Sequence, residues 1–387
     1  MKQALLILEN GKVYRGVGFG ASVISYGELV FNTSMTGYTE SITDPSYAGQ
    51  ILTFSFPLIG NYGVSSKWGE SDKVHPVGIV VSELCNSPFH REQESSLSEF
   101  LEKFSKGGIA GIDTRELVKI IRHAGTMPAV LMVGQEGEKL NAAITFEAAL
   151  AKVTNKDEIG FLDWPSKVAR TKTEFFVWQK NTLTKITETE LVNFSNYKKV
   201  AIIDCGVKQN ILREVAKRGF VTVVVPPNIT FAEIQKYNVS GVVVSNGPGD
   251  PRDYPYIHNL LKQILEYSLN EKNHLPIFGI CLGHQLISYI IGAEVFKMKF
   301  GNRGVNQPVQ NILNQKAFLT SQNHSYAVRP ETIPEGWESL FVNLNDSSVE
   351  GLRHKNKPIF SVQFHPEACG GPKDTNWLFD DFVRSIL

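Results

Sequence analysis

The segment PIFGICLGHQL, Pro276 to Leu286, contains a change of pattern on which the interpretation of the second half of the chain rests. PIFGI is apolar, as in a short buried strand, and residues 282–292 have the apolar spacing of a helix. Cys281 therefore falls on a strand–turn–helix connection, which projects a side chain away from a sheet. The positive potential and unpaired N–H groups of a helix N-terminus favour a thiolate there. A small buried core residue is the alternative, and the cysteine alone does not exclude it.

Three apolar runs of the same kind precede this segment, namely KVAIIDCG, VTVVVPP and GVVVSNGPGD. Helical patterns, such as NILREVAKRGF with its closing Gly219, separate several of them. Val- and Ile-rich strands that alternate with helices predict a parallel sheet covered on both faces. Because ligands of such sheets bind at the carboxyl ends of the strands, we expect the site near Cys281 and near SNGPGDP, Ser245 to Pro251. This glycine-rich loop can supply oxyanion-hole N–H groups beside a thiolate, or it can be an ordinary turn.

A general base for Cys281 is found downstream, in PIFSVQFHPEA. The alternating residues predict a strand that ends at His365, and Pro366 favours an extended conformation there. Residues i and i+2 of an extended chain face the same side, so the Glu367 carboxylate can reach and orient the imidazole. Cys281, His365 and Glu367 would then be a nucleophile, a base and an orienting group. Without the cysteine, a His-x-Glu sequence is equally compatible with a surface pair.

Taken together and in this order, NGPGDP, GICLGHQ and FHPE resemble the motifs of the class I glutamine amidotransferases. The resemblance implies glutamine as the substrate, Cys281, His365 and Glu367 as the catalytic triad, and an oxyanion hole formed by the N–H groups of Gly249 and Leu282. The residues that it implies for the glutamine pocket are Ser46, Gly247, Gly249, Leu282, Gln285, Asn323, Ser325 and Tyr326.

The first part of the chain carries a second resemblance. FNTSMTGYTESITDPSYAGQILTFSFPLIGNYG, Phe31 to Gly63, resembles the N-terminal domain of the small chains of glutamine-dependent carbamoyl-phosphate synthases. GIDTRELVKIIRHAG does so too, and it predicts a helix with Asp113 as its N-cap and Gly125 at its end. KMKFGNRGVNQPV and LTSQNHSYAV resemble the glutaminase domain of the same family. Other amidotransferases generally lack the N-terminal domain, which makes it the main discriminator.

We therefore expect an α/β protein with three parts. Residues 1–150 would form a mixed α/β, strand-rich N-terminal domain, which docks a partner and helps to shape an ammonia path. Residues 151–196 would be a linker or a peripheral segment, such as a hairpin. Residues 197–387 would form the class I glutamine amidotransferase domain, with a mainly parallel sheet flanked by helices.

Some positions depart from the common pattern of the family. Asn302 and Gln307 stand where histidines are frequent, Ser325 where glycine is also found, and Cys369 where serine is common. None of these departures removes a proposed catalytic group.

No metal site is expected. His284 lies in the first turn of the helix that follows Cys281, yet no further ligands have the spacing that zinc needs. His324 is expected to be a structural or pocket residue. The four cysteines are widely spaced, so a disulfide framework is not expected either.

Composition limits the class of partner. Lys+Arg and Asp+Glu number 39 each, and this balance argues against a general polyanion-binding role, so no nucleic-acid partner is expected. There is no apolar stretch of about 18 residues, and therefore no membrane partner is expected. The N-terminus, MKQALLILENGKVYRG, suits a strand, an Asn-Gly turn and a second strand better than a secretory signal, so we expect a cytoplasmic protein.

The resemblance implies a glutaminase subunit of carbamoyl-phosphate synthase, in a heterodimer with the large synthase chain and serving pyrimidine and arginine biosynthesis. No cofactor is expected in this chain, because it has no G-x-x-x-x-G-K-[ST] loop, and ATP and Mg²⁺ are expected on the large chain. The alternatives are a glutaminase subunit for an anthranilate- or purine-type synthetase, which the N-terminal domain disfavours, and a non-catalytic regulatory subunit, which the complete triad disfavours.

Overall fold

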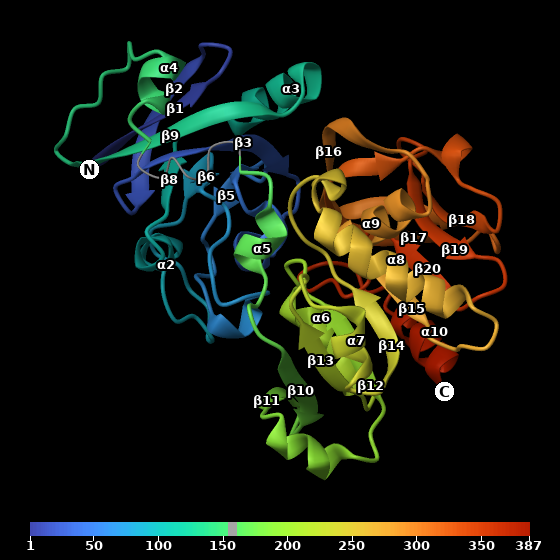
Figure 1. Cartoon of the computed structure of the whole chain (residues 1–387). Coiled ribbons are helices and arrows are strands. Elements are labelled where there is room, and N and C mark those ends of the chain that lie inside the picture. Colours follow the sequence, from blue (N-terminus) through green and yellow to red (C-terminus); the bar gives the residue numbers. More distant parts are fainter. Residues whose placement is uncertain (154–160) are drawn as a thin grey trace. The chain divides into compact units, whose positions relative to one another are not determined.

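The structure, a computed structural model, describes residues 1–153 and 161–387. The chain divides into two compact units, Met1–Phe161 and Leu162–Leu387 (Figure 1). The boundary between them falls inside the segment 151–196. Residues 154–160 of that segment lie outside the described residues.

The first unit is built around a closed β-barrel. In hydrogen-bonding order its strands are β1 (Lys2–Leu8), β2 (Val13–Gly20), β8 (Gly107–Ala110), β6 (Gly78–Val80), β4 (Gln50–Phe54), β3 (Ile24–Asn32) and β9 (Met127–Glu136). β9 pairs with β1 and closes the barrel, so no strand edge remains open. The predicted turn between the first two strands is confirmed, since it joins β1 to β2 with Gly11 at a φ of 84°.

The described residues of this unit also form short helices and two further strands. They are α1 (Tyr38–Ile42), η1 (Pro45–Tyr47), β5 (Leu58–Ile59), η2 (Ser66–Trp68), β7 (Glu83–Leu84), α2 (Leu97–Lys103), α3 (Thr114–Ala124) and α4 (Phe146–Leu150). α3 is the helix that the sequence predicts. The Asp113 carboxylate accepts a hydrogen bond from the N–H of Glu116, and Gly125 ends the helix at a φ of 98°.

The second unit contains an eleven-stranded sheet. Its order is β11 (Thr182–Ile186), β10 (Glu174–Gln179), β13 (Val221–Val225), β12 (Lys199–Ile203), β14 (Val239–Val244), β15 (Ile277–Ile280), β20 (Ile359–Val362), β19 (Val349–His354), β17 (Ala317–Val328), β16 (Val295–Asn311) and β18 (Trp337–Asn343). The five strands from β13 to β20 are parallel, and the strands on both sides of them are antiparallel. β10 and β11 form a hairpin at one edge.

Helices cover both faces of the parallel centre (Figure 1). α7 (Phe231–Gln235), α8 (Pro255–Leu269) and α9 (Leu282–Ile290) pack on the face that includes Ile203. α6 (Gln209–Lys217) and α10 (Trp377–Ile386) pack on the opposite face, with Ile202. Successive strand residues are buried on opposite faces, which explains the near-continuous apolar runs. The predicted fold class is confirmed, and the parallel part of the sheet is its centre.

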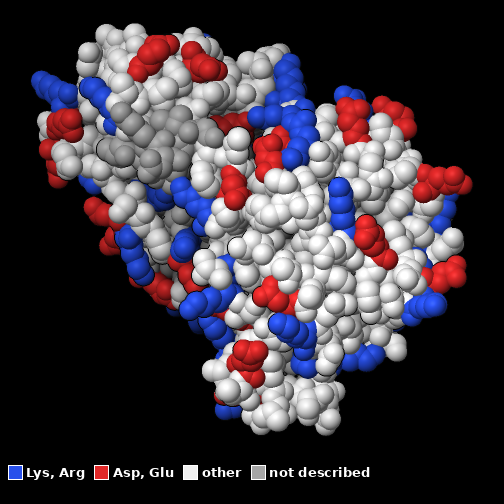
Figure 2. Space-filling view, in the orientation of Figure 1, with Lys and Arg blue, Asp and Glu red and all other residues white. Residues whose placement is uncertain are grey.

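The remaining helices of this unit are short: α5 (Trp164–Val168), η4 (Thr189–Phe194), η5 (Pro251–Asp253) and η6 (Pro330–Thr332). On the face shown in Figure 2, Lys and Arg side chains lie among Asp and Glu, as the equal totals imply. Within the described residues, no helix is long and apolar enough to cross a membrane.

Candidate active site

The turn between β15 and α9 holds Cys281 in an unusual backbone conformation. Its φ is 54° and its ψ is −103°, a backbone conformation that residues other than glycine rarely adopt. The N–H of Cys281 donates to the carbonyl of Val362 on β20 at 2.9 Å. A Cβ on Gly283 would collide with the carbonyl of Val244, so this glycine allows α9 to start close to β14. The predicted strand–turn–helix geometry is therefore present, and Cys281 itself is buried.

His365 and Glu367 meet as the i, i+2 spacing predicts. Nδ1 of His365 lies 2.6 Å from Oε1 of Glu367, and both side chains are fully buried. The strand expected to reach His365 is shorter than predicted, because β20 ends at Val362. His365 instead forms an isolated antiparallel bridge with Ser321, whose carbonyl accepts its N–H at 2.9 Å. The predicted extended conformation does not continue to Glu367, because Pro366 and Glu367 lie in a turn in which the carbonyl of His365 accepts the N–H of Ala368 at 3.2 Å. This turn brings the two side chains together.

Charges around the imidazole hold it in the protonated form. Burial and Lys208 lower the pKa of His365, but Glu367 and Cys281 outweigh them and raise it. Burial alone would raise the pKa of Glu367, but His365 and Lys208 lower it by a larger amount. Glu367 therefore remains a carboxylate that stabilises an imidazolium at neutral pH.

Cys281 is linked to His365 by charge more than by a well-formed hydrogen bond. Cys281 raises the pKa of His365 through both charge and a hydrogen-bond interaction. Nε2 of His365 is buried, and it has no partner of ordinary hydrogen-bond geometry among the described residues. Sγ of Cys281 lies 3.6 Å from the carbonyl oxygen of Asn323. Catalytic hydrogen bonds are often long before substrate binds, so this geometry suits a nucleophile and its base at rest.

The glycine-rich loop follows β14, next to the start of α9. A Cβ on Gly247 would meet the carbonyl of Cys205 and lie 2.8 Å from Cδ2 of Leu282. Gly249 has a φ of 91°, and a Cβ there would strike the hydroxyl of Tyr254. The loop therefore requires glycine at both positions. The Leu282 N–H begins α9 and so has no acceptor within the helix.

The predicted pocket residues on α9 and β17 also lie close together. Nε2 of Gln285 donates to the carbonyl of Tyr326 at 3.1 Å and to Oε1 of Gln363 at 3.0 Å. Asn323 contacts Cys281 through its carbonyl, as described above. The hydroxyl of Ser325 accepts a hydrogen bond from the guanidinium of Arg303. Asn323 and Gln285 thus contact Cys281 directly, whereas Tyr326 contacts Gln285 and Ser325 contacts Arg303. The role of these residues in binding glutamine remains a prediction.

Ser46 belongs to the first unit, apart from the other predicted pocket residues in the chain. It lies on η1, and its N–H donates to the Asp44 carboxylate at 2.9 Å, which caps this short helix. Its assignment to the glutamine pocket remains a prediction.

The two histidines near the elbow are neutral and hydrogen-bonded. Nδ1 of His284 lies 2.9 Å from the Ser361 hydroxyl, and burial lowers the pKa of His284 to about 3. Nδ1 of His324 lies 2.8 Å from the carbonyl of Tyr326, and burial lowers its pKa to about 4. Among the described residues, no group of three or more His, Cys, Asp or Glu side chains could hold a metal ion.

Lys208 and Asn210 contact Glu367 of the predicted triad, and the motif analysis missed both. Nζ of Lys208 lies 3.4 Å from Oε1 of Glu367, and its side chain is buried. The side-chain amide of Asn210 donates to the carbonyl of Glu367. Both residues follow the carboxyl end of β12. Ligands of parallel sheets bind at the carboxyl ends of the strands, and DCGVKQN follows such an end, so the same rule could have found both residues.

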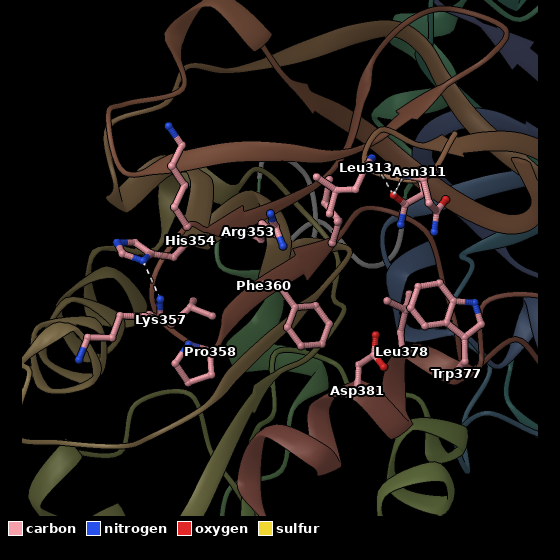
Figure 3. Close-up of a pocket in the computed structure, with 14 residues that line it drawn as sticks. Asn311, Leu313, Arg353, His354, Lys357, Pro358, Phe360, Trp377, Leu378 and Asp381 are labelled. Atoms are coloured by element: carbon pink, nitrogen blue, oxygen red, sulfur yellow. Dashed lines mark hydrogen bonds between the residues drawn. The ribbon is translucent and has the colours of Figure 1, made fainter. Parts of the chain in front are cut away.

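A groove of about 410 Å³ lies elsewhere in the second unit (Figure 3). Its lining includes Pro358 and Phe360 at the amino end of β20, with Trp377 and Asp381 of α10. His365 follows the carboxyl end of the same strand. The lining of the groove contains no residue of the predicted triad, so the groove is separate from the candidate active site.

Comparison with known proteins agrees with both halves of this description. Residues 201–385 match the model of the family Glutamine amidotransferase class-I. Residues 6–131 match that of Carbamoyl-phosphate synthase small chain, CPSase domain. Among the relatives is the carbamoyl phosphate synthase small chain of Akkermansia muciniphila, 42% identical, with 99% of this chain and 97% of the relative covered.

The small chains of Methanocaldococcus jannaschii and Lactococcus lactis subsp. lactis are each 43% identical to this chain. In both cases the similarity covers 99% of this chain and 98% of the relative. Because a family match falls in each of the two units and the similarity extends over almost the whole length, the chain belongs to the family of carbamoyl-phosphate synthase small chains.

Proposed function

We propose that the chain is the glutaminase subunit of a carbamoyl-phosphate synthase and that Cys281, His365 and Glu367 hydrolyse glutamine. The observation that carries the proposal is the buried His365–Glu367 pair, with 2.6 Å between Nδ1 and Oε1, electrostatically coupled to a cysteine at positive φ. A scaffold subunit would have no need of either the buried charges or the strained turn.

In the first half-reaction, the Cys281 thiolate attacks the carbonyl carbon of the glutamine side-chain amide. The N–H groups of Gly249 and Leu282 stabilise the oxyanion that forms. The tetrahedral intermediate collapses as the C–N bond breaks, and the His365 imidazolium donates its proton to the leaving nitrogen. The products are ammonia and a thioester between Cys281 and the glutamyl group.

In the second half-reaction, neutral His365 accepts a proton from water, whose oxygen attacks the thioester carbon. The C–S bond breaks, glutamate leaves, and the thiolate–imidazolium pair is restored. Glu367 stabilises the imidazolium in both halves without itself taking up the proton.

The ammonia must reach an acceptor before water protonates it. We place that acceptor on a large synthase chain, which would bind ATP and Mg²⁺ and make carbamoyl phosphate from bicarbonate. The N-terminal unit would dock this partner. The family match over residues 6–131 favours this partner over an anthranilate- or purine-type synthetase.

A glutamine analogue with an electrophilic carbon tests the proposed nucleophile. Wild-type protein should be modified at Cys281 and should release glutamate from glutamine, whereas Cys281→Ser should do neither. The buried Cys205 serves as the matched control, because Cys205→Ser should leave labelling intact. Labelling at another residue, or glutamate release by Cys281→Ser, would refute the assignment.

A further inference from the structure

The buried carboxylate of Asp204 lies directly after β12, at the start of the loop 204–208 that leads to α6. We propose that Asp204 and Arg170 are positioning residues for the glutaminase site, because together they fix the loop from which Lys208 contacts Glu367. This inference rests on the proposed glutaminase function. Among the described residues, neither Asp204 nor Arg170 forms a hydrogen bond or an ion pair with the predicted triad, so neither is a catalytic residue.

The two oxygens of Asp204 hold two different segments of the chain. Oδ1 accepts from the N–H of Gly206 at 3.0 Å and from the N–H of Val207 at 2.8 Å, which fixes the loop 204–208. Oδ2 accepts from the N–H of Arg170 at 3.1 Å and from its Nη1 at 2.8 Å. Asp204 is only 1% exposed, and a charge at such a depth is stable only when it is paired and hydrogen-bonded. The carboxylate therefore ties the two segments together.

Arg170 comes from the segment between α5 and β10, part of the region that the sequence predicts to be a linker or a peripheral segment. Its Nε donates to Oε2 of Glu174 at 2.8 Å, and its guanidinium carbon lies 5.7 Å from the centre of the Phe176 ring. A planar guanidinium that is held on several sides has little freedom to turn away from its carboxylate. This segment thus anchors the loop 204–208 rather than merely joining the two units.

The far end of the loop leads to the triad. The N–H of Cys205 donates to the Ser245 hydroxyl at 2.9 Å, and the N–H of Lys208 donates to Oδ1 of Asn246 at 3.1 Å. The backbone on the N-terminal side of Lys208 is therefore anchored at residues 205, 206 and 207 as well as at Lys208 itself. From this fixed position, Nζ of Lys208 lies 3.4 Å from Oε1 of Glu367.

The contact between Lys208 and Glu367 makes the position of the loop important for the reaction. Among the described residues, Lys208 is the one lysine or arginine that forms an ion pair with Glu367. The attraction between two charges falls as they separate, and it is strongest where water is excluded. A displaced loop would move this positive charge away from the carboxylate that is proposed to orient His365. Loss of the Arg170–Asp204 pair should therefore slow glutamine hydrolysis through Lys208.

Kinetic coupling between Arg170 and Lys208 tests the proposal in the complex of the full chain with its large partner. Arg170→Met keeps a long side chain and removes the guanidinium, and it should lower kcat/KM for glutamine hydrolysis about tenfold. Lys208→Met should lower kcat/KM by at least as much. If Arg170 acts through Lys208, the double variant should lie within about threefold of Lys208→Met, because the two losses are not additive.

Two further variants keep the test independent of how well Arg170→Met folds. Arg170→Lys can still pair with Asp204, so it should recover kcat/KM to within about threefold of wild type. Asp204→Asn weakens the pair from the other side, because an amide has one accepting oxygen in place of two. It should lower kcat/KM in the wild-type background and cause no further loss when combined with Lys208→Met. Thermal unfolding verifies that each variant is folded at the assay temperature.

Glu174→Gln is the matched control, because it removes the other carboxylate that the same guanidinium contacts and leaves Asp204 in place. It should keep the wild-type kcat/KM. Wild-type kcat/KM in the folded Arg170→Met and Asp204→Asn variants would overturn the positioning role. A double variant about tenfold below Lys208→Met would overturn it too, since the two residues would then act independently. A wild-type complex that releases no glutamate would instead refute the proposed function.

Discussion

Cys281, the proposed nucleophile, lies in a strained stretch of backbone. Its φ of 54° and ψ of −103° cost of the order of 1–3 kcal/mol in a residue with a side chain. The conformation persists because both peptide groups are anchored, since the N–H donates to Val362 and the carbonyl accepts from Gln285 at 3.1 Å. The strain places the sulfur at the carboxyl end of β15, where the proposed chemistry needs it.

Comparing Cys281→Gly with Cys281→Ala measures this strain. Both substitutions remove the sulfur, but only alanine keeps a Cβ in the unfavourable region. Cys281→Gly should therefore be more stable than Cys281→Ala by about 1 kcal/mol in chemical denaturation. Glycine ordinarily destabilises an ordered segment relative to alanine. If Cys281→Ala is the more stable variant, the turn is not strained.

At the scale of elements, the contact between α9 and β14 determines where Cys281, the proposed nucleophile, lies. Gly283 is buried in the first turn of α9, and any Cβ on it would overlap the carbonyl of Val244. A larger residue would push the helix from the sheet, and Cys281 and the Leu282 N–H would move with it.

Gly283→Ala should destabilise the protein by about 1–3 kcal/mol through overpacking and should lower glutamine hydrolysis at least tenfold. Thermal unfolding and glutamate release check the two effects. Tyr289→Ala is the control, because Tyr289 lies on the same helix and is 39% exposed. Wild-type stability and activity in Gly283→Ala would mean that the helix start is adaptable.

At the scale of the whole molecule, the two units match two separate family models, one over residues 6–131 and one over residues 201–385. In the proposed function, this chain supplies only ammonia, and the steps that use ATP occur on the large chain. Glutamine hydrolysis and carbamoyl phosphate synthesis can then be separated by one substitution.

A complex of Cys281→Ser with the large chain should make carbamoyl phosphate from ammonium chloride and not from glutamine. The mutation removes the source of ammonia and leaves the acceptor site intact. Product formation from each nitrogen donor, with the wild-type complex as reference, provides the check. Co-purification should be unaffected. Loss of the ammonium-dependent reaction would show that Cys281 also acts in the partner's chemistry.

Much of this arrangement follows from local sequence patterns. The runs around Ile202 and Val243 predict buried strands, and Gly219 marks a helix end, because each is a short-range effect of side-chain shape and burial. The elbow at Cys281 and the meeting of His365 with Glu367 are also local, since a turn and an i, i+2 spacing suffice. The antiparallel strands β16 to β19 were not predicted, as their pairing depends on contacts distant in sequence.

The sequence by itself determined the parallel strands and helices at the centre of the second unit, the turn that holds Cys281 and the proximity of Glu367 to His365. Only the tertiary structure decided that Lys208 lies against Glu367 and that Glu350 on β19 is buried. The physical reason is that burial and charge pairing depend on which distant segments pack together. A lysine or a glutamate has the same local pattern on a surface as in a core, and its protonation and role follow from the neighbours that folding brings to it.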